Sequence, residues 1–264
     1  MQGAKSGGGI RGVRGVCLDL DGVLYVEGAV IRGAVEAVEH LAASGTPFRY
    51  VTNTTSRSRA SLAKKLAGFG FPAREDTILS APVAAAAMLE ASGVRRIAAL
   101  VTADALSDFS QFELSDESPE AVVVGDLGDA WTPALLNRAM NQVLGGARLV
   151  ALCKSRNWRR ASGLVMDAGP YVAAIEFATG AVADVAGKPS PRFFEAALRS
   201  LQMPAEDVVM IGDDPDSDVA AAQSVGMRGA LVLSGKFRAG DSAMPPDGVF
   251  PSIVEAVEAI LERR

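Results

Sequence analysis

Residues on which many active sites depend are scarce in this sequence of 264 residues, which holds two cysteines and one histidine. Cys17 and Cys153 lie far apart and belong to no Cys-x-x-Cys or Cys/His cluster. This indicates neither a disulfide framework nor a zinc site and favours free buried thiols in a reducing cytoplasm. His40 falls in the middle of a predicted helix, which nearly excludes serine or cysteine hydrolase chemistry with a histidine base.

The sequence also lacks a net positive charge and long apolar runs. The formal net charge of -5 argues against nucleic acid as a partner, because phosphate backbones reward clustered Lys and Arg. The longest apolar run, residues 81–89, is far below the about 18 residues that a membrane span needs. Residues 1–12 have no apolar signal-peptide region, and we expect them to form a disordered leader on a soluble, cytoplasmic protein.

The sequence does contain a regular alternation of short apolar runs with helical patterns. Runs typical of strands occupy residues 15–20, 48–53, 95–101, 121–126, 148–153, 182–187, 207–214 and 229–234. Helical patterns occupy residues 34–45, 59–70, 82–92, 132–146, 170–180, 190–201, 217–226 and the chain from Ser252, where Ser252 and Glu255 have capping-box spacing. Such alternation predicts an α/β fold with a doubly wound parallel sheet.

The last third of the chain returns to the pattern of the first. DVVMIGDD near the C-terminus repeats the arrangement of VCLDLD near the N-terminus, an apolar run that ends in carboxylates. We therefore predict a discontinuous core domain of residues 1–80 and 187–264, with residues 81–186 inserted as a smaller α/β domain.

The carboxylates that end these runs are the first candidate site. Asp19 and Asp21 lie two residues apart, so both would project together at the carboxyl end of a strand, the edge where open α/β sheets bind ligands. Asp213, in GDDPDSD, follows another strand. A single acidic cluster is typical of a solvated turn with an aspartate helix cap. Two clusters, each at a strand end, favour a shared hard cation such as Mg²⁺.

Two further loops fall at the same predicted edge. Thr52, in VTNTTS, ends a strand with hydroxyls and exposed amides that can bind phosphate oxygens. Lys188, in GKPSP, lies between a strand and a helix start, where a compact cation suits a phosphoryl group or an acidic nucleophile. Together with Asp19, Asp21 and Asp213, these residues would supply the parts that phosphoryl transfer requires.

These motifs, in this order, resemble the four signatures of the haloacid dehalogenase (HAD) superfamily. The matching segments are DLDGV (19–23), VTNTT (51–55), GKPSP (187–191) and GDDPDSD (212–218). The insertion resembles the α/β cap of the NagD-type branch. Within that branch, residues 162–180 and 226–241 are similar to phospholysine phosphohistidine inorganic pyrophosphate phosphatase and its relatives. The resemblance implies a Rossmann-like catalytic core, a cap, and an Mg²⁺-dependent phosphatase of small phosphorylated metabolites.

The resemblance also implies catalytic and metal-binding roles. Asp19 would attack phosphorus to form an aspartyl-phosphate. Asp21 would protonate the leaving group, later deprotonate the hydrolytic water, and bind the metal through its backbone carbonyl. Asp19 and Asp213 would supply carboxylate ligands to Mg²⁺, and Lys188 would balance charge on Asp19 and the transferring group.

The remaining implied roles concern the phosphate and the surroundings of the metal. Thr52, with the amides near Asn53 and Thr54, would hold phosphoryl oxygens, together with Lys188. Asp214 or Asp218 would act on the metal through a bound water molecule or by contacting the metal's direct ligands.

One position departs from the subgroup that the chain resembles. The phospholysine and phosphohistidine enzyme that it resembles has a serine where this chain has Asp21, and so lacks the usual general acid. Because an alkoxide leaving group gains about 10²- to 10⁴-fold from a positioned acid, we expect Asp21 to favour ordinary phosphate monoesters. Phosphoramidates such as phospholysine and phosphohistidine, and inorganic pyrophosphate, stay as alternative substrates.

Three further interpretations stay open. The composition of residues 156–160 predicts a basic, aromatic loop in the cap. This loop would bind an anionic substrate, form part of the exposed surface, or contact a second subunit. By analogy with relatives that pair through their caps, we expect a homodimer. A receiver-like signalling module would use a similar Asp, Thr and Lys set to store phosphate, but the inserted cap and Asp21 argue against it.

Overall fold

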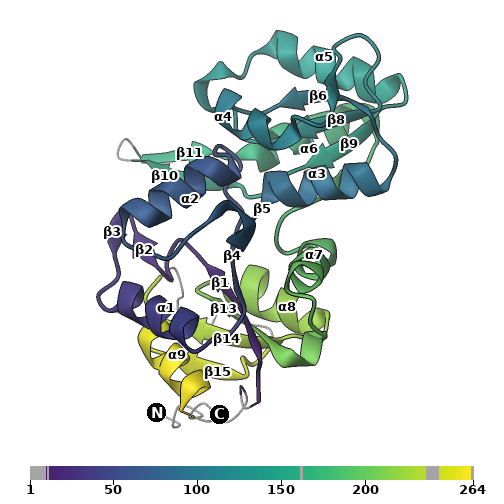
Figure 1. Ribbon diagram of the computed structural model, residues 1–264. Coiled ribbons are helices and arrows are strands. Elements are labelled where there is room, and N and C mark those ends of the chain that lie inside the picture. Colours follow the sequence, from purple (N-terminus) through teal and green to yellow (C-terminus); the bar gives the residue numbers. More distant parts are fainter. Residues whose placement is uncertain (1–9, 11, 161–162, 236–243, 263–264) are drawn as a thin grey trace. The chain divides into compact units, whose positions relative to one another are not determined.

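The computed structural model describes residues 10, 12–160, 163–235 and 244–262. The chain forms two compact units, one made of residues 1–52, 62–79 and 188–264 and the other of residues 53–61 and 80–187. Each unit is built around its own sheet (Figure 1). The catalytic and cap roles expected for the predicted domains stay predictions.

The first unit contains a six-stranded sheet in the order β15-β14-β13-β1-β4-β5. Its strands are β1 (Gly15–Asp19), β4 (Phe48–Thr52), β5 (Ile78–Ser80), β13 (Val208–Gly212), β14 (Arg228–Val232) and β15 (Gly248–Phe250). β1 pairs in parallel with both β13 and β4. A fully buried central strand needs apolar residues on both faces, and all five residues of β1 are buried.

Helices cover both faces of this sheet (Figure 1). They are α1 (Ala34–Ala43), α2 (Arg59–Gly68), α7 (Pro191–Leu201), α8 (Ala221–Ser224) and α9 (Ile253–Leu261). The apolar stripes of α1, α2 and α9 enter one core cluster with β1 and β13. A two-stranded hairpin, β2 (Tyr25–Val26) and β3 (Ala29–Val30), follows β1. The α/β prediction with parallel sheets is thereby confirmed.

The second unit has a parallel five-stranded sheet in the order β12-β9-β8-β6-β7. The strands are β6 (Arg96–Leu100), β7 (Glu113–Leu114), β8 (Ala121–Val124), β9 (Arg148–Ala151) and β12 (Asp184–Val185). α3 (Ala81–Ala91) and α4 (Ala103–Leu106) pack on one face, and α5 (Pro133–Leu144) and α6 (Ala168–Thr179) on the other. Thus one core cluster lies on each side of the sheet.

Several local predictions differ from the structure. The run 182–187 yields only the two residues of β12, and the helix expected at 217–226 is a π-helix, Pro215–Ala220, followed by the short α8. Residues 157–160 are not a loop but β10 (Asn157–Arg160), because they pair antiparallel with β11 (Gly163–Met166). Most of the predicted leader lies outside the described residues, whereas Ile10 is buried in the core.

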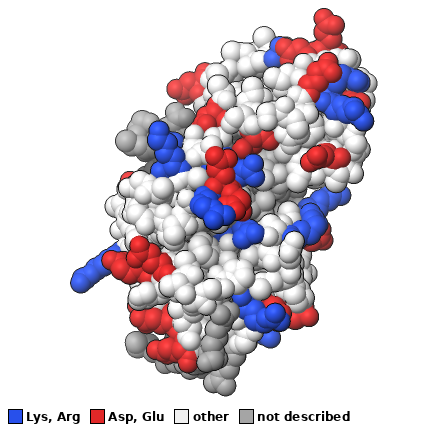
Figure 2. Space-filling model, viewed as in Figure 1, with Lys and Arg blue, Asp and Glu red and all other residues white. Residues whose placement is uncertain are grey.

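No helix among the described residues combines the length and the apolar character that crossing a bilayer requires. On the face seen in Figure 2, Lys and Arg side chains alternate with Asp and Glu side chains instead of gathering into one basic field.

Candidate active site

Asp19 and Asp213 reach the same edge of the first unit's sheet because their strands are parallel neighbours. Leu18 of β1 is in register with Ile211 of β13. Asp19, the last residue of β1, therefore lies beside the carboxyl end of β13. Thr52 ends β4 on the other side of β1 and is buried. The structure therefore brings together three of the residues that the sequence placed at this edge.

Lys188 lies between two carboxylates. Its ammonium donates to Asp19 Oδ1 at 2.8 Å and to Asp218 Oδ1 at 2.6 Å. The lysine side chain is 4% exposed, and those of Asp19 and Asp218 are 10% and 1% exposed. Burial opposes the charge, but the two carboxylates raise the pKa of Lys188 above its usual value, so the lysine is a cation at neutral pH.

Asp218 contacts the lysine directly. Its carboxylate accepts from both Lys188 Nζ and, at 3.2 Å, the backbone N–H of Asp214. Its expected action on the metal, through water or through the direct ligands, stays a prediction. Burial, together with the nearby negative charges of Asp19 and Asp213, raises the pKa of Asp218 to about 7 against the opposing effect of Lys188. No sequence signal separated this residue from the other acids of GDDPDSD.

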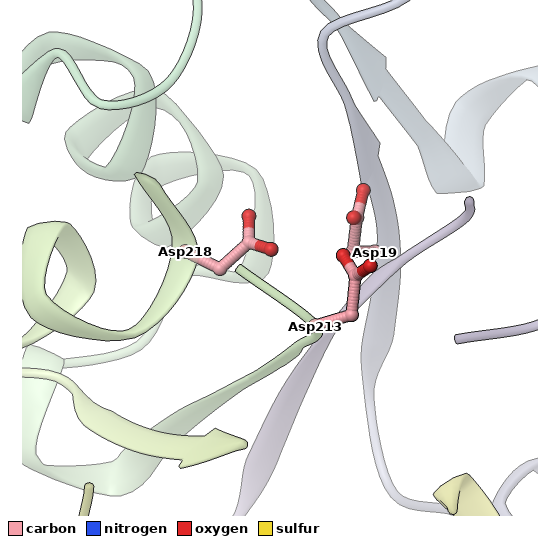
Figure 3. A group of neighbouring side chains, drawn as sticks. All are labelled: Asp19, Asp213 and Asp218. Atoms are coloured by element: carbon pink, nitrogen blue, oxygen red, sulfur yellow. The ribbon is translucent and has the colours of Figure 1, made fainter. Parts of the chain in front are cut away.

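Asp19, Asp213 and Asp218 form a compact group, with one carboxylate oxygen of each within 4.8 Å of the others. Figure 3 shows the three side chains together, from the end of β1 and from the segment after β13. These three side chains offer buried carboxylate oxygens close to one another, and hard oxygen ligands of this kind suit Mg²⁺. The donor set thus fits the ion that the sequence predicted.

Two glycines make room for the carboxylate of Asp213. A Cβ atom built on Gly22 would lie 2.2 Å from Asp213 Oδ2, and one on Gly235 would lie 2.1 Å from it. Gly22 also has a φ of 85°, which disfavours other residues. Ser234 Oγ donates to the carbonyl of Gly22 at 2.7 Å and so joins the two loops. Sequence reasoning missed Gly235 and Ser234, which lie outside the four motifs.

Asp21 projects from the turn after β1. It is exposed, unlike Asp19, and the hydroxyl of Tyr25 donates to its Oδ2 over 3.5 Å. The backbone N–H of Gly22 donates to the carbonyl of Tyr25 at 2.8 Å, which closes the turn. The ammonium of Lys65 lies 3.9 Å from the centre of the Tyr25 ring. An exposed acid on a closed turn has the access that a proton donor to substrate needs.

The other predicted residues have different positions. Asp214 Oδ1 accepts from the backbone N–H groups of Asp216 and Ser217 and thereby caps the π-helix that carries Asp218. Asn53 and Thr54 follow Thr52 directly in the chain but belong to the second unit. Their expected role in binding phosphate stays a prediction.

The comparisons with known proteins agree with this arrangement. The sequence model of the haloacid dehalogenase-like hydrolases matches residues 16–115, and a HAD-hydrolase-like model matches residues 185–256. The human haloacid dehalogenase-like hydrolase domain-containing protein 2 is 41% identical over 255 residues, which are 96% of this chain and 97% of that protein. The chain therefore belongs to the haloacid dehalogenase-like hydrolases and is an enzyme of the hydrolase class.

Two named groups of phosphatases are among the relatives. The human phospholysine phosphohistidine inorganic pyrophosphate phosphatase is 39% identical over 262 residues, 96% of each chain. Among solved structures, the p-nitrophenyl phosphatase from Archaeoglobus fulgidus superposes with a TM-score of 0.88 at 29% identity, covering 94% of this chain and 99% of that chain. NagD from E. coli has a TM-score of 0.86 at 26% identity, covering 92% and 98%. The predicted HAD, NagD-type relationship is thus confirmed.

Proposed function

We propose that this protein is an Mg²⁺-dependent phosphatase that hydrolyses small phosphorylated metabolites through an aspartyl-phosphate on Asp19. The observation that carries the proposal is the position of Asp19, whose carboxylate accepts from the buried Lys188 ammonium and lies in a group with Asp213 and Asp218. Phosphatase names among the relatives support the same class of reaction.

The first half-reaction transfers the phosphoryl group to the enzyme. An oxygen of Asp19 forms a bond to phosphorus while the bond from phosphorus to the leaving oxygen breaks, and Asp21 gives that oxygen its proton. Lys188 offsets the negative charge that gathers on Asp19 and the phosphoryl oxygens. Thr52, with the amides near Asn53 and Thr54, holds those oxygens in line for attack.

The second half-reaction returns the enzyme to its starting state. Asp21, now ionised, takes a proton from water while that water forms a bond to phosphorus and the bond to Asp19 breaks, which releases inorganic phosphate. Asp19, Asp213 and the backbone carbonyl of Asp21 would hold Mg²⁺, with Asp214 and Asp218 supporting those ligands. The ion would supply further positive charge to the phosphoryl oxygens.

Asp21 is the basis for preferring monoesters. A phosphoramidate nitrogen can be protonated by solvent before cleavage, whereas an ester oxygen benefits from a positioned acid. Cleavage of phosphoramidates or pyrophosphate is the second candidate, favoured by the relative that is 39% identical and named for these substrates. Turnover of phospholysine that far exceeds that of every ester would reverse the order of the two candidates.

The test is release of inorganic phosphate from a panel of esters, anhydrides and phosphoramidates with Mg²⁺. We expect multiple turnovers of p-nitrophenyl phosphate by the wild type, and a loss of at least about 10³-fold in Asp19→Asn. Asp76→Asn, which removes an exposed carboxylate of the same unit, is the matched control. Activity that survives in Asp19→Asn contradicts the proposal, and a single stoichiometric phosphorylation without turnover indicates a receiver-like module instead.

Two expectations about the cellular setting extend this proposal. A homodimer is expected by analogy with NagD-type relatives, and light scattering across a concentration series measures it. The free, buried thiols of Cys17 and Cys153 favour a reducing, cytoplasmic setting.

A further inference from the structure

The segment that follows Thr52 is held by residues far from it in sequence. Residues 53–58 contain no helix or strand. They belong to the second unit, together with the sheet formed by β12, β9, β8, β6 and β7. Their polar contacts therefore decide where the amides and hydroxyls of this segment lie.

The segment begins against the end of β12. A Cβ atom on Gly187, the residue before Lys188, would lie 2.5 Å from Asn53 Oδ1 and 2.5 Å from the carbonyl oxygen of Leu152. The N–H of Gly187 donates to that same Leu152 carbonyl at 3.0 Å. The Asn53 side chain thus packs on a glycine at the carboxyl ends of β9 and β12.

The next contact lies at the carboxyl end of β8. The backbone N–H of Asp126 donates to Thr55 Oγ1 at 3.1 Å, and this hydrogen bond is buried. Gly125 lies directly before Asp126 and borders Thr55, since a Cβ atom built on Gly125 would lie 3.5 Å from Thr55 Cβ, an ordinary van der Waals distance.

The last contacts lie just after β6. Thr102 Oγ1 donates to the carbonyl of Ser56 at 2.8 Å. Asp104 Oδ1 accepts from Ser58 Oγ at 2.7 Å and from Ser61 Oγ at 2.8 Å. In chain order, the segment crosses the carboxyl ends of β12, β9, β8 and β6, which is the order of these strands in the sheet.

We propose that the carboxyl edge of the second unit's sheet positions the phosphate-binding segment, and that Asp104 and Thr102 are positioning residues for phosphate. This inference rests on the proposed function. A segment without its own secondary structure presents phosphate ligands in a fixed array only if its ends and carbonyls are tied down. One carboxylate oxygen of Asp104 accepts hydrogen bonds from the hydroxyls of both Ser58 and Ser61. Hydrogen bonds to a charged acceptor are stronger than those between neutral groups.

The test measures inhibition by inorganic phosphate and the split between KM and kcat for p-nitrophenyl phosphate, with Mg²⁺ and the full chain. We expect Asp104→Ala to raise the inhibition constant of phosphate and the KM about five- to twentyfold, because the segment is no longer fixed. Asp104→Asn, whose amide oxygen can still accept from both serines, restores most of the affinity. Asp116→Asn is the matched control, since it removes the ion pair with Arg138 on the surface of the same unit.

Four outcomes are informative. Weakened phosphate binding in Asp104→Ala with rescue in Asp104→Asn supports the inference. A lower melting temperature with an inhibition constant within about twofold of wild type overturns it, because it assigns Asp104 a merely structural role. Should Asp104→Ala fail to fold, Thr102→Val removes the bond to Ser56 and is judged by the same criterion. Absence of Asp19-dependent turnover in the wild type overturns the proposed function, and this inference with it.

Discussion

At the scale of single residues, the site depends on a small number of charged groups held close together inside the protein. Lys188 is the cation that two buried carboxylates share, and each of them is within hydrogen-bond distance of it. Removing one partner from a buried ion pair leaves the other charges without compensation, which commonly costs about 3 to 5 kcal/mol. The lysine therefore affects both stability and chemistry.

Lys188→Met is expected to abolish turnover and to destabilise the protein by about 3 kcal/mol at pH 8. Loss of the ammonium raises the pKa of Asp218 further above its already raised value of about 7. A carboxyl group whose pKa is raised in the folded state destabilises the protein when it is ionised and not when it is protonated. The loss of unfolding free energy in Lys188→Met should therefore grow as the pH rises through the pKa of Asp218. Urea unfolding in EDTA at pH 5 and pH 8 measures this, with the exposed Lys64→Met as the control; a deficit larger at pH 5 contradicts it.

A second residue-scale prediction concerns the space around Asp213. Gly22→Ala places a methyl group 2.2 Å from Asp213 Oδ2 and also imposes a side chain at a φ of 85°. We expect activity to fall at least about 10²-fold, because the displaced carboxylate no longer faces Asp19.

Gly45→Ala separates the two effects of that substitution. Gly45 has a φ of 72°, and a methyl group added there would meet nothing within 4 Å, so its replacement should cost only the backbone strain of roughly 1 to 2 kcal/mol. Thermal melting and initial rates are compared for both variants. Equal activities in the two alanine variants would show that crowding of Asp213 does not matter.

At the scale of elements, much of the arrangement could be predicted from the sequence. Apolar runs of strand length between amphipathic helices predicted the α/β fold, and the parallel pairing of β1 with β13 then brings Asp19 and Asp213 to one edge. The capping box of Ser252 and Glu255 also follows from spacing alone, and the structure has it. These features are local or follow from the geometry of parallel strands.

The remaining features depend on contacts between distant segments, which no local pattern reveals. Whether Asp213 or Asp218 would meet Lys188 depends on the π-helix that follows β13, where a regular α-helix was expected. Gly22 and Gly235 both border Asp213, although they lie more than two hundred residues apart in the sequence. Likewise, the assignment of residues 53–61 to the second unit depends on partners such as Asp104, 46 residues from Ser58.

The prediction at this scale is that Glu255 stabilises the start of α9 only while it is ionised. Its Oε2 accepts from the Ser252 N–H at 3.0 Å and from Ser252 Oγ at 2.6 Å, and the hydrogen bond from the Ser252 side chain is the main cause that lowers its pKa. A carboxyl with a lowered pKa in the folded state contributes stability above its unfolded pKa of about 4.3, and the contribution is lost as the pH falls through the folded value.

Glu255→Gln should therefore lose about 0.5 to 1 kcal/mol of unfolding free energy at pH 7 and close to nothing at pH 3. Denaturant titrations at both pH values measure the difference, and Glu258→Gln, an exposed glutamate of the same helix, is the control. A loss of the same size at both pH values would assign the effect to the side chain's shape and not to its charge.

At the scale of the whole molecule, the chain passes between its two units after residues 52, 61, 79 and 187. Two of these points fall inside signature motifs, between Thr52 and Asn53 and between Gly187 and Lys188. The carboxylate group of Asp19, Asp213 and Asp218, in contrast, belongs entirely to the first unit. A cation bound by those carboxylates should therefore stabilise the first unit in preference to the second.

We expect Mg²⁺ to raise the melting temperature and to slow amide hydrogen exchange in β1 and β13, with little change in β6 and β8. A ligand that binds only the folded state stabilises it by about 2.7 kcal/mol at one hundred times its dissociation constant. Without the ion, the three carboxylates repel one another, so Asp213→Asn should be more stable than wild type in EDTA and should lose the Mg²⁺ shift. Asp76→Asn, an exposed acid of the same unit, should keep the wild-type shift. An Mg²⁺ shift that persists in Asp213→Asn, or slowed exchange that is equal in both units, would place the ion elsewhere.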